Sequence, residues 1–137
     1  MIIYFYIGVV CLSSECFCNF YESDRPSLTL VKALNNMTKE NGEEILMKCE
    51  FRGHPQPTIS WYRNEAPIEP IKNKLEIRTN NSTGTAGKVV SRLRLLRADT
   101  HDMGFYKCEG SNTFETRETI GILRIEGGEC CFLSSYI

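Results

Sequence analysis

The sequence predicts an all-β fold in which two antiparallel sheets pack face to face. From residue 27 onward, short stretches alternate apolar and polar side chains, and this period of two is typical of strands with one buried and one solvated face. Turn signals separate the stretches. GHPQP at 53–57 carries two prolines, and NNSTGTAGK at 80–88 is polar and contains glycine. No segment has the periodicity of an amphipathic helix.

Seven stretches account for the expected strands, at 27–31, 44–51, 58–63, 74–78, 89–96, 105–110 and 116–125. The apolar side chains that share a face of their strand, from the second strand to the seventh, are Ile45, Met47, Cys49 and Phe51; Ile59 and Trp61; Leu75 and Ile77; Leu93 and Leu95; Tyr106 and Cys108; and Ile120 and Ile122. The proline-bearing connection at 53–57 cannot be a central strand, and 80–88 is expected to be a hairpin loop.

Length and composition describe one globular domain with short extensions. The chain has 137 residues, of which 42% are hydrophobic, and 16 basic against 17 acidic residues leave a formal net charge of −1. This balance gives no reason to expect a nucleic-acid partner. Seven cysteines favour an oxidising compartment, and the odd number means that at least one is removed, free or paired outside the chain.

The two ends differ in character from the middle of the chain. Residues 1–12 are uncharged and mostly apolar, and Ser13 and Ser14 follow, so we expect a signal peptide at 1–16 and a linker at 17–26. The alternative is that the first residues are not native. The domain is expected at 27–126, with a tail at 127–137 outside it. Twelve apolar residues are fewer than the ~20 that span a bilayer, so we expect membrane attachment only through sequence beyond this chain.

Cys49, Trp61 and Cys108 form the strongest signal in the sequence. The tryptophan lies 12 positions after the first cysteine, and the second cysteine lies 59 positions after it. This pattern resembles the immunoglobulin sandwich, in which the two cysteines face inward from opposite sheets and the tryptophan packs on their disulfide. The resemblance implies a Cys49–Cys108 disulfide, which in the chain-entropy model contributes about 4 kcal/mol.

A second signal is DMGFYKC at 102–108. Tyr106 lies two residues before the second cysteine, where the tyrosine corner of an immunoglobulin fold belongs. Gly104 permits a tight turn into that strand, and Asp102 is placed to pair with a basic residue, for which Arg78 is the candidate. Leu93 and Leu95 in the preceding strand are expected in the core.

The pattern G-x-P-x-P-x-I-x-W at 53–61 resembles immunoglobulin domains of the intermediate set. LTLVKALNNMT at 28–38, PQPTISWYRNEAPI at 55–68, GFYKCEGSN at 104–112 and IGILRI at 120–125 look like the N-terminal immunoglobulin domain of ROR-family receptor tyrosine kinases. This resemblance implies an extracellular module that takes part in Wnt-type ligand signalling. The cysteine-rich domain, kringle, membrane span and kinase of that family are not in this sequence, so kinase activity and anchorage are not expected of it.

Surface chemistry offers candidate modification and binding sites. Three sequons begin at Asn36, Asn80 and Asn81, and adjacent Asn80 and Asn81 are not expected to carry glycans together. A basic cluster on and around the fifth strand, formed by Lys88, Arg92, Arg94 and Arg97, is either a solvated face or a weak contact for heparan sulfate. Neither the pair Cys16 and Cys18 nor the pair Cys130 and Cys131 has the C-x2–4-C spacing of a zinc site. The adjacent Cys130 and Cys131 favour partners in a downstream domain.

The sequence contains no arrangement of residues for catalysis. The two histidines, His54 and His101, fall in expected loops, and no hydrolase, metalloprotease, kinase or phosphate-loop motif occurs. We therefore expect a secreted or cell-surface binding module without cofactor or metal, whose partner is an extracellular protein ligand or co-receptor. Two alternatives remain open, namely a cell-adhesion domain that binds a like domain and a secreted soluble antagonist.

Overall fold

The computed structural model describes residues 5–6, 9–12, 15–17, 25–81 and 87–127. Three short strands precede the main body: β1 (Phe5–Tyr6), β2 (Val9–Leu12) and β3 (Glu15–Phe17), which pair in the order β1-β2-β3. The expected signal peptide and linker lie partly, and the expected tail almost wholly, outside the described residues.

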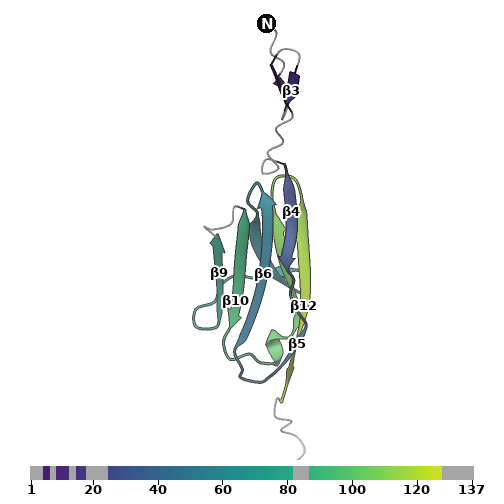
Figure 1. The fold of residues 1–137 in the computed structure, drawn as a ribbon. Coiled ribbons are helices and arrows are strands. Elements are labelled where there is room, and N and C mark those ends of the chain that lie inside the picture. The colour runs from purple at the N-terminus through teal and green to yellow at the C-terminus, as the bar shows by residue number, and fades with distance from the viewer. Residues whose placement is uncertain (1–4, 7–8, 13–14, 18–24, 82–86, 128–137) are drawn as a thin grey trace, which may run out of the picture.

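The main body is a sandwich of two sheets, and this confirms the predicted fold class (Figure 1). One sheet has the order β4-β6-β10-β9 and the other β5-β12-β11-β7-β8. The strands are β4 (Ser27–Lys32), β5 (Met37–Glu40), β6 (Ile45–His54), β7 (Thr58–Arg63), β8 (Ala66–Pro67), β9 (Leu75–Asn81), β10 (Lys88–Leu95), β11 (Gly104–Ser111) and β12 (Thr116–Glu126). All neighbours pair antiparallel except β5 and β12, which are parallel.

The core lies between the sheets and follows the alternation of the strands. In β6 the residues Ile45, Met47, Cys49 and Phe51 are all buried, as the sequence predicts. In β10 the inward positions are Val89, Ser91, Leu93 and Leu95, and the positions between them are half-exposed. Burial of such side chains stabilises the fold by about 1.5–3 kcal/mol each relative to exposure.

In the last strand the apolar residues face opposite sides. The buried positions of β12 are Thr119, Gly121, Leu123 and Ile125, whereas Ile120 is exposed and Ile122 is half-buried. Register decides this, because Thr119 lies opposite the inward Cys108. Gly121 suits a crowded inward position, since a Cβ there would lie 2.8 Å from the Asn35 carbonyl oxygen and 3.0 Å from the Leu34 Cβ. The shared face of Ile120 and Ile122 is therefore the outer one.

The sequence did not predict that the first part of the domain changes sheets. β4 pairs with β6, and after residues 33–36 the chain continues as β5 beside β12 (Figure 1). Two bonds hold the crossing: the Leu34 N–H donates to Thr119 Oγ1 at 3.0 Å, and the Ile122 N–H donates to Asn36 Oδ1 at 2.9 Å.

Two strands run further than expected. β6 continues through Gly53 and His54, which were expected to belong to the connection at 53–57. Only the part of that segment with the prolines at 55 and 57 follows the strand. β9 includes Asn80 and Asn81, paired with Val90 and Val89. The connection between β9 and β10 is therefore shorter than the expected 80–88 loop. Its residues 82–86 lie outside the described part of the chain.

Candidate functional site: the two outer sheet faces

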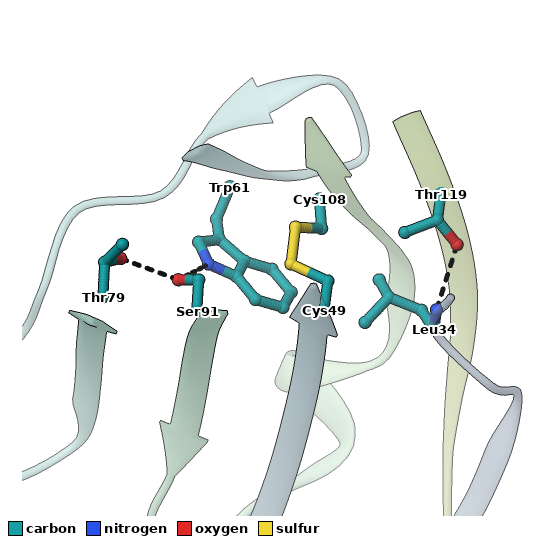
Figure 2. Close-up of a disulfide and its surroundings, with 7 residues drawn as sticks. All are labelled: Leu34, Cys49, Trp61, Thr79, Ser91, Cys108 and Thr119. Carbon is teal, nitrogen blue, oxygen red and sulfur yellow. Dashed lines mark hydrogen bonds between the residues drawn. A yellow bond between two sulfur atoms is a disulfide. The ribbon is translucent and has the colours of Figure 1, made fainter. Parts of the chain in front are cut away.

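The Cys49–Cys108 disulfide joins the two sheets, as the immunoglobulin resemblance implies, with 6.6 Å between the Cα atoms. The indole of Trp61 lies beside it (Figure 2). Trp61 Nε1 donates to Ser91 Oγ at 2.9 Å, and Ser91 Oγ is 2.8 Å from Thr79 Oγ1. This chain of polar groups, buried at Trp61 and Ser91 and exposed at Thr79, was not predicted, because a serine among apolar strand residues carries no signal of its partner.

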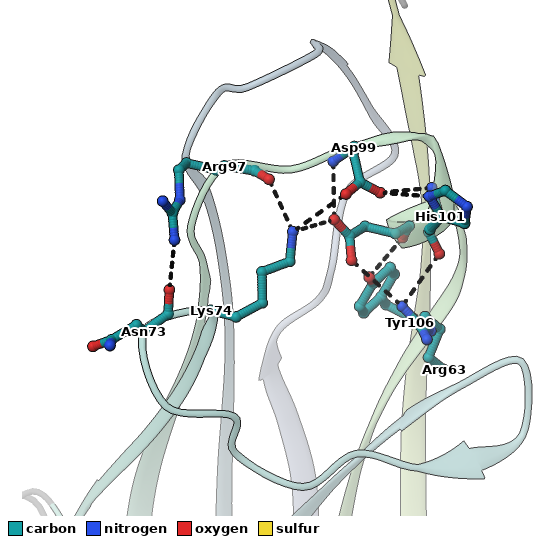
Figure 3. A network of polar contacts seen from close by, with 8 residues as sticks. Arg63, Asn73, Lys74, Arg97, Asp99, His101 and Tyr106 are labelled. Atoms are coloured by element: carbon teal, nitrogen blue, oxygen red, sulfur yellow. Dashed lines mark hydrogen bonds and ion pairs between the residues drawn. The ribbon is translucent and has the colours of Figure 1, made fainter.

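Tyr106 is fully buried, and its hydroxyl donates to the backbone carbonyl of Asp102 at 2.7 Å (Figure 3). Burial is the main cause that raises the pKa of this phenol. Asp102 lies in the 3₁₀ helix η2 (Thr100–Asp102), and the side chain of Asp99 caps that helix by accepting from the His101 N–H. The tyrosine thus anchors the turn that leads into β11.

The expected partner of Asp102 is wrong. Its carboxylate contacts Lys74 Nζ at 2.7 Å and Arg63 Nη1 at 3.7 Å (Figure 3). Arg78 instead contacts Glu76 at 3.4 Å. Arg78 faces outward from β9, opposite Arg92, and Lys74 precedes that strand beside the η2 turn. The spatial neighbour of a turn carboxylate is set by the returning chain, which spacing along the sequence does not reveal.

Gly104 begins β11 with a φ of 150°, and a Cβ there would lie 2.7 Å from Asn64 Oδ1. The same Asn64 Oδ1 accepts the N–H of Phe105 at 3.0 Å. The absence of a side chain at Gly104 therefore leaves room for Asn64 to hydrogen-bond the backbone of Phe105. Leu93 and Leu95 are buried in β10. These predicted signature residues build the interior, and surface recognition must come from other side chains.

The outer face of the five-stranded sheet carries an apolar patch. We define the β11–β12 patch as Phe105, Ile120, Ile122 and Tyr62. Phe105 is 57% exposed and Ile120 48% exposed, and Ile122 lies directly opposite Phe105 in the register. Large apolar side chains that are grouped on one face and exposed to solvent are typical of interaction sites.

A charged side chain crosses the β11–β12 patch. The Lys107 Nζ lies 4.8 Å from the centre of the Tyr62 ring, 2.6 Å from Glu65 Oε2 and 3.6 Å from Glu118 Oε2. The hydrogen bond that Lys107 donates to Glu65 is the main cause that raises the pKa of Lys107. An apolar centre with paired charges around it has the composition of a protein-binding surface.

The outer face of the four-stranded sheet is basic. Glu50 is buried there, 2.5 Å from Lys48 Nζ and 3.1 Å from Lys88 Nζ. The hydrogen bond from Lys48, followed by that from Lys88, lowers the pKa of Glu50. Arg94 donates to both carboxylate oxygens of Glu44, at 2.7 and 3.0 Å, and this pairing lowers the pKa of Glu44.

The structure divides the basic cluster that the sequence predicts. Lys88, Arg92 and Arg94 share the outer face of β10, whereas Arg97 follows the strand with a φ of 49° and donates to the Asn73 carbonyl at 3.3 Å. Arg97 therefore belongs to the η2 end of the molecule. Lys48 and Arg78, on the neighbouring strands, take its place beside Arg92.

The sequon asparagines Asn36, Asn80 and Asn81 are all exposed. Asn36 lies at the edge of the β11–β12 patch through its bond to Ile122, and Asn80 and Asn81 end β9. Among the described residues, no three His, Cys, Asp or Glu side chains are close enough to hold a metal ion. In the same part of the chain, no helix has the length and apolar character to cross a bilayer.

Comparison with known proteins agrees with this architecture. The family model for the immunoglobulin I-set domain matches residues 28–125. Hemicentin-2 of Mus musculus is 30% identical over 90 residues, or 66% of this chain, and zig-3 of Caenorhabditis elegans, a "Zwei Ig domain protein", is 27% identical over 107 residues, or 75%. The netrin receptor DCC of Rattus norvegicus is 29% identical over 90 residues, again 66% of this chain.

The chain spans less than half of each of these relatives: 2% of hemicentin-2, 43% of zig-3 and 6% of DCC. A chimeric titin Z1Z2 structure superposes with a TM-score of 0.63 at 19% identity, over 75% of this chain and 98% of that one, which is a likeness of fold. Because the I-set model covers most of the sequence, the chain belongs to the immunoglobulin I-set family.

Proposed function

We propose that this I-set domain is an extracellular binding module that contacts a protein partner through the β11–β12 patch and performs no catalysis. The observation that carries the proposal is the exposure of Phe105 and Ile120 on one sheet face. Covering their exposed halves would contribute about 1.5–3 kcal/mol in total, because full burial of one such side chain is worth about 1.5–3 kcal/mol. A domain of this fold is generally non-catalytic and recognises partners by its faces and loops.

Several features support a place outside the cell or on its surface. The chain has seven cysteines and a disulfide between Cys49 and Cys108. Its first twelve residues have the apolar character of an export signal, and the sequon at Asn36 is on an exposed part of the domain. A glycan on Asn36 would stand at the edge of the β11–β12 patch and restrict the direction from which a partner approaches.

Protein recognition is also what the names of related proteins describe. DCC is a netrin receptor, and a structure similar in fold holds titin M10 in complex with obscurin-like 1. The resemblance of residues 27–125 to ROR-family receptors adds a finer proposal, in which the partner is a Wnt-type ligand or co-receptor. Coding sequence after Ile137 for a cysteine-rich domain and a kinase would support that proposal. Further immunoglobulin repeats after Ile137 would favour a cell-adhesion protein. A stop codon there in an abundant transcript would favour a soluble antagonist.

The experiment screens the secreted full chain against an array of extracellular proteins that includes the chain itself. Each hit is retested with Phe105→Ser/Ile120→Ser and with a control, Leu46→Ser. Leu46 is 57% exposed but faces outward from the other sheet. We expect the double variant to lose at least about tenfold in affinity, which corresponds to ~1.4 kcal/mol, and the control to keep its affinity. Hits that tolerate the double variant, or lose as much with Leu46→Ser, would overturn the assignment of the face.

A further inference from the structure

Three cations lie side by side across the four-stranded sheet. Arg92 in β10 is directly opposite Lys48 in β6 on one side and Arg78 in β9 on the other. All three point to the outer face, because the positions between them in each strand face the core or the inner side. Neighbouring strands are ~4.8 Å apart, so the row spans about 10 Å. Like charges directly opposite each other destabilise a sheet, so this arrangement requires a reason.

The nearby carboxylates do not neutralise the centre of the row. Glu50 is held by Lys48 and Lys88, and Glu44 is held by Arg94. Within the described part of the chain, Arg92 has no ion-pair or hydrogen-bonding partner for its guanidinium. Arg78 is 75% exposed and contacts Glu76 only at 3.4 Å. Guanidinium groups are therefore presented to solvent with their donors available.

The whole face has an excess of positive charge that the whole chain lacks. On the outer side of this sheet the described basic residues outnumber the acidic ones, although the chain as a whole has a formal net charge of −1. The basic residues are Lys32, Lys48, Arg52, Arg78, Lys88, Arg92 and Arg94, and the acidic residues are Glu44, Glu50 and Glu76. Segregated charge of this kind attracts an oppositely charged partner.

We propose that the outer face of β6, β10 and β9 binds a sulfated polysaccharide, with Arg92 at the centre and Lys48 and Arg78 on either side. Guanidinium forks match oxoanions with two parallel hydrogen bonds, and a flat row over three strands fits a linear polyanion better than a small ligand, which needs a concave pocket. In the extracellular setting proposed above, sulfated chains are the polyanions of this form. The two outer faces are on opposite sides of the sandwich, so this site and the β11–β12 patch can be occupied together.

The test measures binding of the full chain to a size-defined heparin oligosaccharide at 150 mM salt, where weak surface attraction is screened. All proteins carry Asn80→Gln and Asn81→Gln, since Asn80 lies on the same face and a sugar there would cover the row. The variants are Arg92→Gln and Arg78→Gln/Arg92→Gln. The matched control is Arg124→Gln, which makes the same charge change at an exposed position in β12, on the other sheet.

We expect the double variant to bind at least about tenfold more weakly and the Arg124→Gln control to bind as the parent does. The melting temperature of Arg92→Gln should equal or exceed that of the parent, because the change relieves cross-strand repulsion. No binding by the parent, or an equal loss in the control, would overturn the site. Binding to desulfated heparin or to single-stranded DNA as tight as to heparin would overturn the assignment to a sulfated chain. A negative result in the protein screen would leave this measurement unaffected, because the screen tests the β11–β12 patch and heparin binding tests the outer face of the other sheet.

Discussion

Replacing Ser91 by alanine tests whether the buried hydrogen bond from the tryptophan is a working part of the core. Ser91 is fully buried in β10, and its hydroxyl accepts the Trp61 indole N–H at 2.9 Å (Figure 2). The substitution leaves that donor buried without a partner, which costs about 1–3 kcal/mol. The Thr79 hydroxyl also loses its 2.8 Å hydrogen bond to Ser91 Oγ, but Thr79 is exposed, so water can replace that partner. We expect a net loss of about 1–2 kcal/mol.

A double-mutant cycle with Trp61→Phe isolates the interaction. In the Trp61→Phe background there is no indole N–H to leave unsatisfied, so Ser91→Ala should cost less than it does in the parent. The difference, the coupling energy, is expected at about 1 kcal/mol, within the usual range for residues in contact. The loss of ring volume in Trp61→Phe destabilises both members of its pair and cancels in the cycle.

Urea unfolding followed by far-ultraviolet circular dichroism is the appropriate assay. Fluorescence cannot serve, because Trp61 is the only tryptophan in the sequence and one arm of the cycle removes it. Similar m-values in all four proteins would show that the free energies of unfolding are comparable. An equal cost of Ser91→Ala in both backgrounds, or a stabilisation by it in the parent, would refute the reasoning.

Two further predictions concern the tyrosine turn and the outer carboxylate. Tyr106→Phe removes the 2.7 Å bond to Asp102 and should cost about 1–2 kcal/mol in denaturant unfolding, less than the about 3–5 kcal/mol expected for Trp61→Ala. Because burial raises the pKa of Tyr106, its contribution is present below the unfolded value of about 10 and is lost as pH rises past it, so Tyr106→Phe should flatten the alkaline slope of stability. The lowered pKa of Glu50 has the opposite sign: its contribution is present above the ordinary value of 4.5 and disappears as pH falls through the folded value. Melting curves from pH 7 to 3 should show a shallower acid slope for Glu50→Gln, and an unchanged slope would contradict the charge pairing.

Local patterns in the sequence predict the strands and the disulfide between the two sheets. Alternation locates β6 and its inward set from Ile45 to Phe51, because a pleated strand sends successive side chains to opposite sides. The Cys–Trp–Cys spacing implies the disulfide through its resemblance to a known fold. Such features depend on residues close in the chain or on one long-range pairing that recurs in a family.

Weak or short patterns escaped prediction. β5 and β8 have four and two residues, too few for a period of two to stand out, and the change of sheet between β4 and β5 depends on bonds to Thr119 and Asn36. The outward position of Ile120 was equally hidden. Alternation shows that Ile120 and Ile122 share a face, but only their pairing with β11 decides that this face is the outer one.

The sequence by itself determined that this protein is an all-β sandwich of the immunoglobulin type, closed by Cys49 and Cys108, because strand periodicity and signature spacing are properties of the linear chain. The tertiary structure alone decided that Lys74 rather than Arg78 pairs with Asp102, and that Lys48, Arg92 and Arg78 form one row. Charges interact through space over a few ångströms, and residues dozens of positions apart reach that distance only when the register of neighbouring strands is established.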